Sequence, residues 1–227
     1  MMEHNRLNLP VGIQRFENIR KGGFLYVDKT KYLVDMIKGG RIYFLARPRR
    51  FGKSVIVSTF EAMFAGEKEL FKGLYAEEFM NNFEAGPVIR LDMSGVTTDD
   101  GIEGIKSSIL WQVKTIAHKL GASLSDIQSP GNLFANLIIS TADKYNQQVA
   151  VLIDEYDAPY TEFVNNPDMA IEVRTVLRSF YKQLKANEEY IRFIFITGIS
   201  KFARFGVFST LNNPIPWFYG SICSISV

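Results

Sequence analysis

Short apolar stretches alternate with longer amphipathic ones, and this alternation limits the possible folds of the chain more than any other feature of its sequence. The apolar stretches predict strands at 41–46, 88–93, 149–153 and 191–196. Apolar residues at spacings of three and four predict helices at about 30–38, 53–65, 102–120, 133–145 and 173–184. Strands separated by helices are joined through crossover connections, which make the strands parallel. The pattern therefore predicts an α/β fold with helices on both faces of a parallel sheet.

The segment between the first predicted strand and the helix at 53–65 favours a phosphate-binding loop. Gly52 lets the backbone approach an anion, and the helix that follows offers unpaired amides and a partial positive charge. Lys53 suits the β- and γ-phosphates, and the Ser54 hydroxyl suits Mg²⁺. The residues assigned to nucleotide contacts are Arg49, Arg50, Phe51, Gly52, Lys53, Ser54 and Val55.

A basic surface turn before an ordinary helix is the alternative interpretation of this loop. The usual pattern begins with a glycine that four residues separate from Gly-Lys-Ser/Thr, and this chain has Arg47 at that position. The basic residues of the loop could also touch nucleic acid, although their position favours nucleotide contact. Lys53 is expected to face solvent in part when no nucleotide is bound, so that folding does not depend on it.

Carboxylates follow the strand predicted at 149–153. Because function gathers at the carboxyl ends of parallel strands, Asp154 is a candidate Mg²⁺ ligand and Glu155 a candidate to orient the attacking water. Successive strand residues point to opposite faces, so the strand must end here if both carboxylates are to reach one nucleotide. A solvated strand end, or a helix cap at Asp157 before Ala158 and Pro159, is the alternative.

The strand predicted at 191–196 ends in hydroxyl and basic groups. Thr197 and Ser200 are candidates to hydrogen-bond the attacking water or a phosphate, and Lys201 is a candidate to stabilise transition-state charge. Arg204 is a further candidate for that charge, but a solvated surface position is favoured for it. An ordinary turn with solvated basic residues is the alternative for the whole segment.

Composition narrows the remaining classes of function. The net charge of +2 gives no strong preference for nucleic acid or membranes, and apolar runs are far shorter than the ~20 residues of a membrane helix. Cys223, the single cysteine, cannot form an internal disulfide, which fits a reducing compartment. Together with the short apolar runs, this predicts a cytoplasmic protein without a membrane partner. His4 and His118, the two histidines, form no Cys/His cluster, which disfavours zinc.

Several motifs, in this order, resemble those of the bacterial AAA-ATPase-like domain family over about residues 7–213. They are Leu9–Ile13 with Phe16, Tyr26–Thr30, Arg47–Ser54, Leu152–Asp157, Thr197–Lys201 and Leu211–Asn213. In that family an arginine-proline phosphate loop is normal, so Arg47 fits the pattern. The resemblance implies a P-loop NTPase fold that binds ATP with Mg²⁺. Family members often carry a C-terminal domain resembling PD-(D/E)xK nucleases.

The resemblance predicts the organisation of the chain. We expect an N-terminal segment at 1–40 that packs on the core, a P-loop ATPase domain at 41–213, and a short atypical tail at 214–227 in place of the nuclease-like domain. The tail could supply a fifth strand. Mg²⁺-dependent ATP hydrolysis is the predicted function, and the absence of an Asn-Lys-x-Asp run favours ATP over GTP. A regulatory nucleotide-binding module without turnover, or the ATPase half of a DNA-processing protein, remain alternatives, with DNA or a protein effector as further partners.

Overall fold

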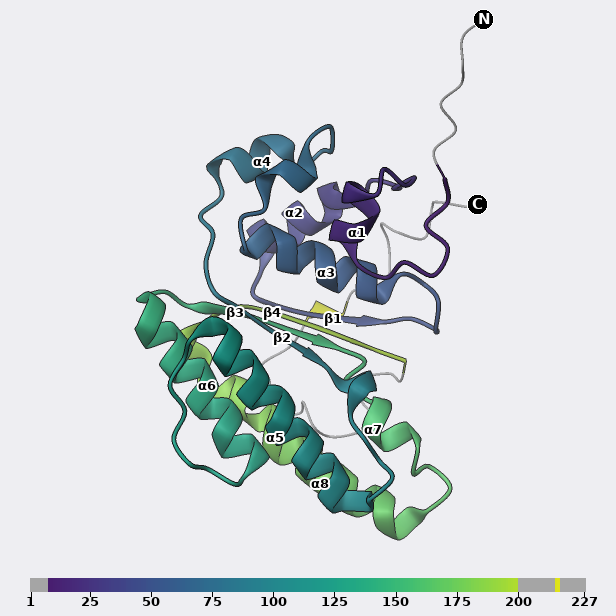
Figure 1. Cartoon of the computed structure of the whole chain (residues 1–227), viewed down its shortest axis with the longest axis vertical. Coiled ribbons are helices and arrows are strands. Elements are labelled where there is room, and N and C mark those ends of the chain that lie inside the picture. Colours follow the sequence, from purple (N-terminus) through teal and green to yellow (C-terminus); the bar gives the residue numbers. More distant parts are fainter. Residues whose placement is uncertain (1–7, 200–214, 217–227) are drawn as a thin grey trace, which may run out of the picture.

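A parallel sheet with helices on both faces forms the centre of the molecule (Figure 1). The computed structural model describes residues 8–199 and the backbone of 215–216. The strand order is β2-β3-β4-β1-β5, and every pairing is parallel. The strands are β1 (Ile42–Ala46), β2 (Val88–Asp92), β3 (Val149–Asp154), β4 (Ile191–Gly198) and the short β5 (Ile215–Pro216). The sheet thus confirms the predicted α/β architecture.

Four helices cover one face of the sheet, and three long helices cover the other (Figure 1). The first group is α1 (Phe16–Lys21), α2 (Thr30–Gly39), α3 (Lys53–Phe64) and α4 (Glu77–Asn82). The second group is α5 (Gly101–Leu120), α6 (Pro130–Tyr145) and α8 (Pro167–Ala186). The short α7 (Ala158–Thr161) follows β3, and 3-10 turns lie at Lys68–Phe71, Met93–Gly95 and Glu188–Tyr190.

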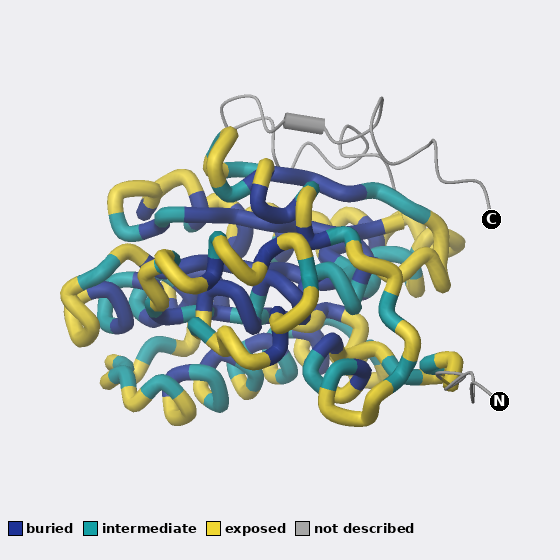
Figure 2. The backbone as a smooth tube through the Cα atoms, turned by 90° about the horizontal axis from the view of Figure 1, so that it is seen from above, coloured by how far each residue is buried: buried dark blue, intermediate teal, exposed yellow. Residues whose placement is uncertain are grey.

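Successive side chains of a strand point to opposite faces of the sheet, so one sheet contributes to two hydrophobic cores. In β2, Ile89 and Leu91 point into the core shared with α5, α6 and α8, whereas Val88 packs on the core shared with α1 to α4. All of β3 is buried, so Val149–Asp154 shows no alternation between buried and exposed positions. Buried backbone of this kind is dark blue in Figure 2. Burying one such apolar side chain contributes about 1.5–3 kcal/mol, which makes these two cores the main source of stability.

Local signals set the ends of several helices where the sequence predicts them. Asp28 accepts hydrogen bonds from the Thr30 amide at 2.8 Å and the Thr30 hydroxyl at 2.7 Å, which fixes the start of α2. Gly121 ends α5 with a φ of 59°, a left-handed value that glycine adopts easily. The predictions missed α1, α4 and α7, because each is too short to show a helical period.

The order of the strands places the functional candidates on one edge. β4 lies between β1 and β3, so the loop after β1 and the end of β3 flank the end of β4. β4 is thus inserted between the two strands that lead into the predicted motifs. The short β5 comes from the predicted tail and pairs with β1. Within residues 8–199, no helix is both long and apolar enough to cross a membrane.

Candidate functional site

The loop between β1 and α3 has the backbone shape of an anion cradle. Gly52, the residue before α3, has a φ of 71°, and Arg50 also adopts a left-handed φ of 68°. An added Cβ at Gly52 would meet nothing within 4 Å, so the backbone there is openly accessible. Turns of this kind direct amides toward one point, and the first turn of α3 adds unpaired N–H groups and a partial positive charge.

Lys53 is buried, and the expectation that it faces solvent is wrong. Its side chain is only 3% exposed, and its ammonium donates hydrogen bonds to the carbonyl oxygens of Arg47 and Pro48, both at 3.2 Å. The two carbonyls satisfy the buried ammonium by hydrogen bonding, which is what a charged group removed from water requires. The Lys53 ammonium also lies 3.9 Å from Oε1 of Glu155, which links the loop to the end of β3.

The backbone turns sharply where β3 ends. Asp154 is the last residue of the strand, and Glu155 adopts a left-handed φ of 51°. This turn confirms that the strand ends between the two carboxylates and lets Glu155 swing toward the phosphate loop. A left-handed φ is rare for a residue with a long side chain and costs about 1–3 kcal/mol, so surrounding contacts must maintain it.

Thr197, at the end of β4, supplies those contacts. Its fully buried hydroxyl donates to Oδ1 of Asp154 at 2.6 Å and accepts from the Glu155 amide at 3.2 Å. One residue therefore fixes the Asp154 carboxylate and the backbone of Glu155 together. Because the only hydroxyl hydrogen is directed at Asp154, Thr197 cannot donate to a phosphate while that bond is formed.

Two further contacts join the ends of β3 and β4. The Tyr156 amide donates to the Thr197 carbonyl at 2.9 Å, and the buried Asp157 carboxylate accepts from the Ile199 amide at 3.1 and 3.2 Å. Asp157 precedes α7 but makes no side-chain cap with it. Its carboxylate instead anchors the chain that leaves β4, which makes it a structural group beside Glu155.

A cavity of about 840 Å³ lies over this edge of the sheet and brings the two motifs together. Most of the predicted nucleotide-binding residues line it, namely Arg49, Arg50, Gly52, Lys53, Ser54 and Val55, and Glu155 lines it from β3. The cavity has further lining residues that were not predicted as site residues, namely Val11–Gln14, Asp92 and Ser94. The volume of the cavity is within the ~300–1,000 Å³ typical of small-ligand sites.

The donor set in the cavity fits a nucleotide with Mg²⁺. The Ser54 hydroxyl makes no hydrogen bond within residues 8–199, and it is available to an incoming ligand. In the same part of the chain, no group of three or more His, Cys, Asp or Glu side chains could hold a metal ion alone. Mg²⁺ commonly takes one or two protein ligands and completes its shell with substrate phosphates and water, which matches this arrangement.

Comparison with known proteins gives this site a family context. The model of a family described as "Predicted AAA-ATPase" matches residues 10–208. The chain belongs to this AAA-ATPase-like family. It is 35% identical over 210 residues to a protein of Azotobacter chroococcum mcd 1, whose description is "Uncharacterized protein in vnfD 5'region". The match covers 92% of this chain and 40% of that relative's length. No solved structure matches the chain.

Within this AAA-ATPase-like fold, the remaining predicted site residues occupy several kinds of position. The Phe51 side chain is 62% exposed and does not line the cavity, and Asp154 is buried behind Thr197. Ser200, Lys201 and Arg204 lie outside the described residues, as does most of the predicted tail. The roles assigned to all these residues, and the domain division at 40 and 213, stay predictions.

A simple signal could have identified Asp92. It ends β2 at the same edge of the sheet as Asp154, and the two residues are paired in the β2–β3 register. Because the strand was predicted to run over 88–93, Asp92 was expected inside the strand, whereas β2 ends at Asp92. Val11–Gln14 gave no such signal, because they form a turn whose position depends on the packing of α1 on α3.

Proposed function

We propose that the protein binds ATP with Mg²⁺ in the cavity of about 840 Å³ and hydrolyses it. One observation carries this proposal: the start of α3, the Lys53 ammonium and the Glu155 carboxylate all line the same cavity, with 3.9 Å between the two charged groups. Membership of a family of predicted ATPases supports it.

The phosphate loop would bind the triphosphate. The amides of the first turn of α3 and of the left-handed turn at Arg50 and Gly52 would hold the phosphates, since unpaired N–H groups at a helix start favour anions. Lys53 exchanges its bonds to the Arg47 and Pro48 carbonyls for phosphate oxygens, because an ammonium bonds a charged oxygen more strongly than a carbonyl.

Ser54 and Asp154 are the residues that would hold Mg²⁺, Ser54 through its hydroxyl and Asp154 directly or through water. The ion supplies neutralisation of the charge that develops on the phosphates during transfer. Glu155, released from Lys53 when the triphosphate takes over that cation, orients the attacking water. Its carboxylate is 24% exposed at the cavity, so it can reach a water without unfolding the end of β3.

A titration of the purified protein with ATP and with GTP, each with and without Mg²⁺, tests the binding step. Lys53→Ala should weaken Mg-ATP binding about 10–150-fold, because charge-assisted hydrogen bonds contribute about 1.5–3 kcal/mol. Lys31→Ala is the matched control, since Lys31 is an exposed lysine of α2 away from the cavity. Equal affinity of the parent and Lys53→Ala would show that this loop is not the phosphate site.

The same protein, assayed for phosphate release with and without duplex DNA, separates the alternatives left open by the sequence. Turnover without DNA supports the proposed ATPase. Turnover that requires DNA identifies the ATPase half of a DNA-processing protein. ATP binding with no phosphate release under either condition identifies a regulatory nucleotide-binding module.

A further inference from the structure

Strand β2 forms an edge of the sheet, where it pairs with β3 alone. The Ala150 amide donates to the Pro87 carbonyl at 3.0 Å, which shows that Pro87 directs its main chain toward β3. Because these directions alternate along a strand, Ile89 and Leu91 also face β3. The main-chain groups of Val88, Arg90 and Asp92 therefore point away from the sheet.

One part of this outer edge is closed, and the other part is open. The Gln112 side chain accepts from the Asp92 amide at 2.8 Å and donates to the Asp92 carbonyl at 2.9 Å, which closes the edge at that residue. The main-chain groups of Val88 and Arg90 that point outward have no hydrogen-bond partner within residues 8–199. An unpaired edge of this kind is a template for another strand.

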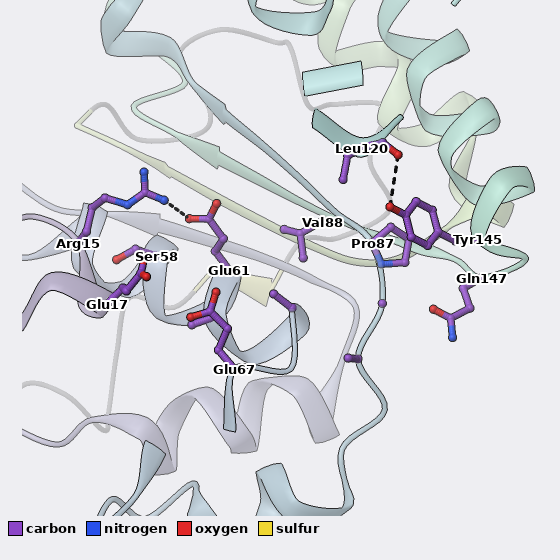
Figure 3. A pocket seen from close by; sticks show the side chains of 14 residues that line it. Arg15, Glu17, Ser58, Glu61, Glu67, Pro87, Val88, Leu120, Tyr145 and Gln147 are labelled. Carbon is purple, nitrogen blue, oxygen red and sulfur yellow. Dashed lines mark hydrogen bonds and ion pairs between the residues drawn. The ribbon is translucent and has the colours of Figure 1, made fainter. Parts of the chain in front are cut away.

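A second cavity, of about 520 Å³, lies beside the open part of β2 (Figure 3). Glu61 and Glu67 lie on its α3 side, and Leu120 and Tyr145 lie on the opposite side, with Val88 between them. The Tyr145 hydroxyl donates to the Leu120 carbonyl at 3.3 Å, which fixes the tyrosine ring at the rim. The α3 side of the cavity thus has an excess of negative charge, with three glutamates against Arg15, and the opposite side is largely apolar, with Gln147 as its polar residue.

The acidic side carries charge without a partner. Glu61 is paired with Arg15 at 3.0 Å and with Arg90 at 2.6 Å, whereas Glu67 has no ion pair in the described part of the chain. Partial burial and the nearby Glu17 and Glu61 carboxylates raise the pKa of Glu67, and the Lys21 and Arg15 cations offset this rise only in part. A cation placed beside Glu67 would relieve this repulsion.

We propose that the open edge of β2 binds an extended segment of a partner polypeptide in which lysine or arginine residues alternate with apolar residues. The added strand would pair its main chain with Val88 and Arg90, a common mode of peptide recognition. Alternate side chains would then face opposite sides of the sheet. The basic set meets Glu67 on the α3 side, and the apolar set meets Leu120 and Tyr145 on the other side.

A second copy of the chain fits this edge poorly. Two β2 edges that paired antiparallel about a two-fold axis would extend one sheet, with the α3 layers of both copies on the same side. The Glu67 side chains of both copies would then lie on the same side of the joined sheet, so that pairing would add like charge on that side and supply neither glutamate with a cation. A basic partner strand avoids this repulsion, which favours it over a dimer.

Fluorescence anisotropy with labelled synthetic peptides tests the proposal. The probe is a peptide in which lysine alternates with valine, and the control peptide has the same composition with lysines and valines in separate blocks. The alternating peptide should bind about tenfold more tightly than the block peptide, since only the alternating one satisfies both sides of the cavity. Equal binding of the two peptides, or no binding of either, would overturn the proposal.

Two charge reversals locate the binding surface. Glu67→Lys should weaken binding of the alternating peptide about tenfold, because an attraction is replaced by a repulsion. Glu69→Lys should leave binding unchanged, since the Glu69 side chain is 80% exposed, pairs with Lys72 and does not line the cavity. Equal effects of the two variants would assign the binding to net charge and overturn the proposal, and circular dichroism checks that both variants are folded.

Amide hydrogen exchange gives a second, main-chain measurement. The alternating peptide should slow exchange at Val88 and Arg90, whereas exchange at Asp92 should change little, because Gln112 already bonds that amide. Unchanged exchange at Val88 and Arg90 with peptide bound would place the peptide elsewhere. Slow exchange without peptide, together with a dimer in sedimentation, would assign the edge to a second copy of the chain.

Discussion

The phosphate loop and the joined ends of β3 and β4 line or support the same cavity, but different kinds of contact maintain them. The hydrogen bonds of Lys53 reach back only to Arg47 and Pro48, within the loop itself. Thr197 bonds Asp154 and Glu155 across 43 and 42 positions of sequence, and these bonds are mostly buried. Short-range bonds therefore dominate in the loop, whose longer-range contacts are the Arg47 amide on the Gly198 carbonyl at 3.1 Å and Lys53 beside Glu155 at 3.9 Å. The joined strand ends depend instead on the packing of the whole sheet.

Because of this difference, we expect the phosphate loop and the joined ends of β3 and β4 to play different parts in the site. A local loop can exchange its internal bonds for phosphate contacts without disturbing the fold. The end of β3 cannot move as freely, because a shift of Thr197 would disturb Asp154 and Glu155 together. Groups fixed in advance need little reorganisation during a reaction, which is the property expected of a site that orients water. The comparison predicts that the loop tolerates substitution better than the joined strand ends.

The largest effect is expected for Glu155→Gln. Glutamine keeps the shape of the side chain but removes its negative charge, so phosphate release should fall about 10²–10⁴-fold, the range typical of general-base and water-orienting groups. Mg-ATP affinity should change little, because the loop supplies the phosphate contacts. Titration and a coupled phosphate assay measure the two quantities.

The control for this variant is Glu162→Gln, at an exposed glutamate after α7 that does not line the cavity. It should match the parent in both assays. Parent-like phosphate release by Glu155→Gln would remove Glu155 from the proposed mechanism, and Asp154 would then be the next carboxylate to test.

Thr197→Val should cause the next largest effect, a loss of about 2–3 kcal/mol of unfolding free energy. The variant removes the bond to the buried Asp154 carboxylate, and hydrogen bonds to charged groups are worth about 1.5–3 kcal/mol. Chemical denaturation measures the change. Thr197→Ser should recover most of the stability, because serine keeps the hydroxyl.

Thr141→Val is a matched control for this variant, since the Thr141 hydroxyl is buried and has no hydrogen-bond partner within the described residues. Its removal should be neutral or slightly stabilising, because a buried unpaired hydroxyl costs free energy. Similar losses for Thr197→Val and Thr141→Val would mean that packing, rather than the bridge between Asp154 and Glu155, determines the effect.

Lys53→Met should cost less stability than Thr197→Val, about 1 kcal/mol, even though it should remove most ATP binding. The Arg47 and Pro48 carbonyls lie in an exposed loop, where water can replace the lost ammonium, so only the net value of ordinary hydrogen bonds is lost. Methionine keeps most of the apolar volume of the buried lysine stem. Denaturation of both variants measures the difference, and a larger loss for Lys53→Met would reverse the proposed contrast between the two regions.

The same contrast explains what the sequence could predict. The helix start after Gly52 and the apolar run before Asp154 are local patterns, so the strands, the loop and their shared edge were predictable. The burial of Lys53 was not, because it depends on how the carbonyls of Arg47 and Pro48 fold back over the ammonium. The role of Thr197 in positioning Asp154 depends on the register between β3 and β4, which no local pattern contains.

Backbone conformation was the other feature that the sequence did not reveal. Arg50 and Glu155 are two of the three non-glycine residues with positive φ among the described residues, and both line the candidate site. The third, Asn146, ends α6, and asparagine adopts this conformation readily. Arginine and glutamate have no such preference, so the left-handed conformations of Arg50 and Glu155 could not be predicted from residue type and are seen only in the folded structure.

The smallest effect is expected at Arg50, and it tests whether the loop stores strain. Arg50→Gly and Arg50→Ala both remove the guanidinium, but only glycine adopts a φ of 68° without steric cost. The left-handed penalty is about 1–2 kcal/mol, and glycine loses about 0.5–1 kcal/mol of it through greater freedom in the unfolded chain. Arg50→Gly should therefore be more stable than Arg50→Ala by about 0.5–1 kcal/mol in chemical denaturation. A lower stability of Arg50→Gly than of Arg50→Ala would show that the turn is not strained, because only the cost of glycine's greater freedom in the unfolded chain would then remain. A comparison of their ATP affinities with that of the parent then separates charge from backbone. An equal loss of affinity in both variants would assign the role of Arg50 to its guanidinium, and weaker binding by Arg50→Gly than by Arg50→Ala would show that a rigid left-handed turn helps to shape the phosphate loop.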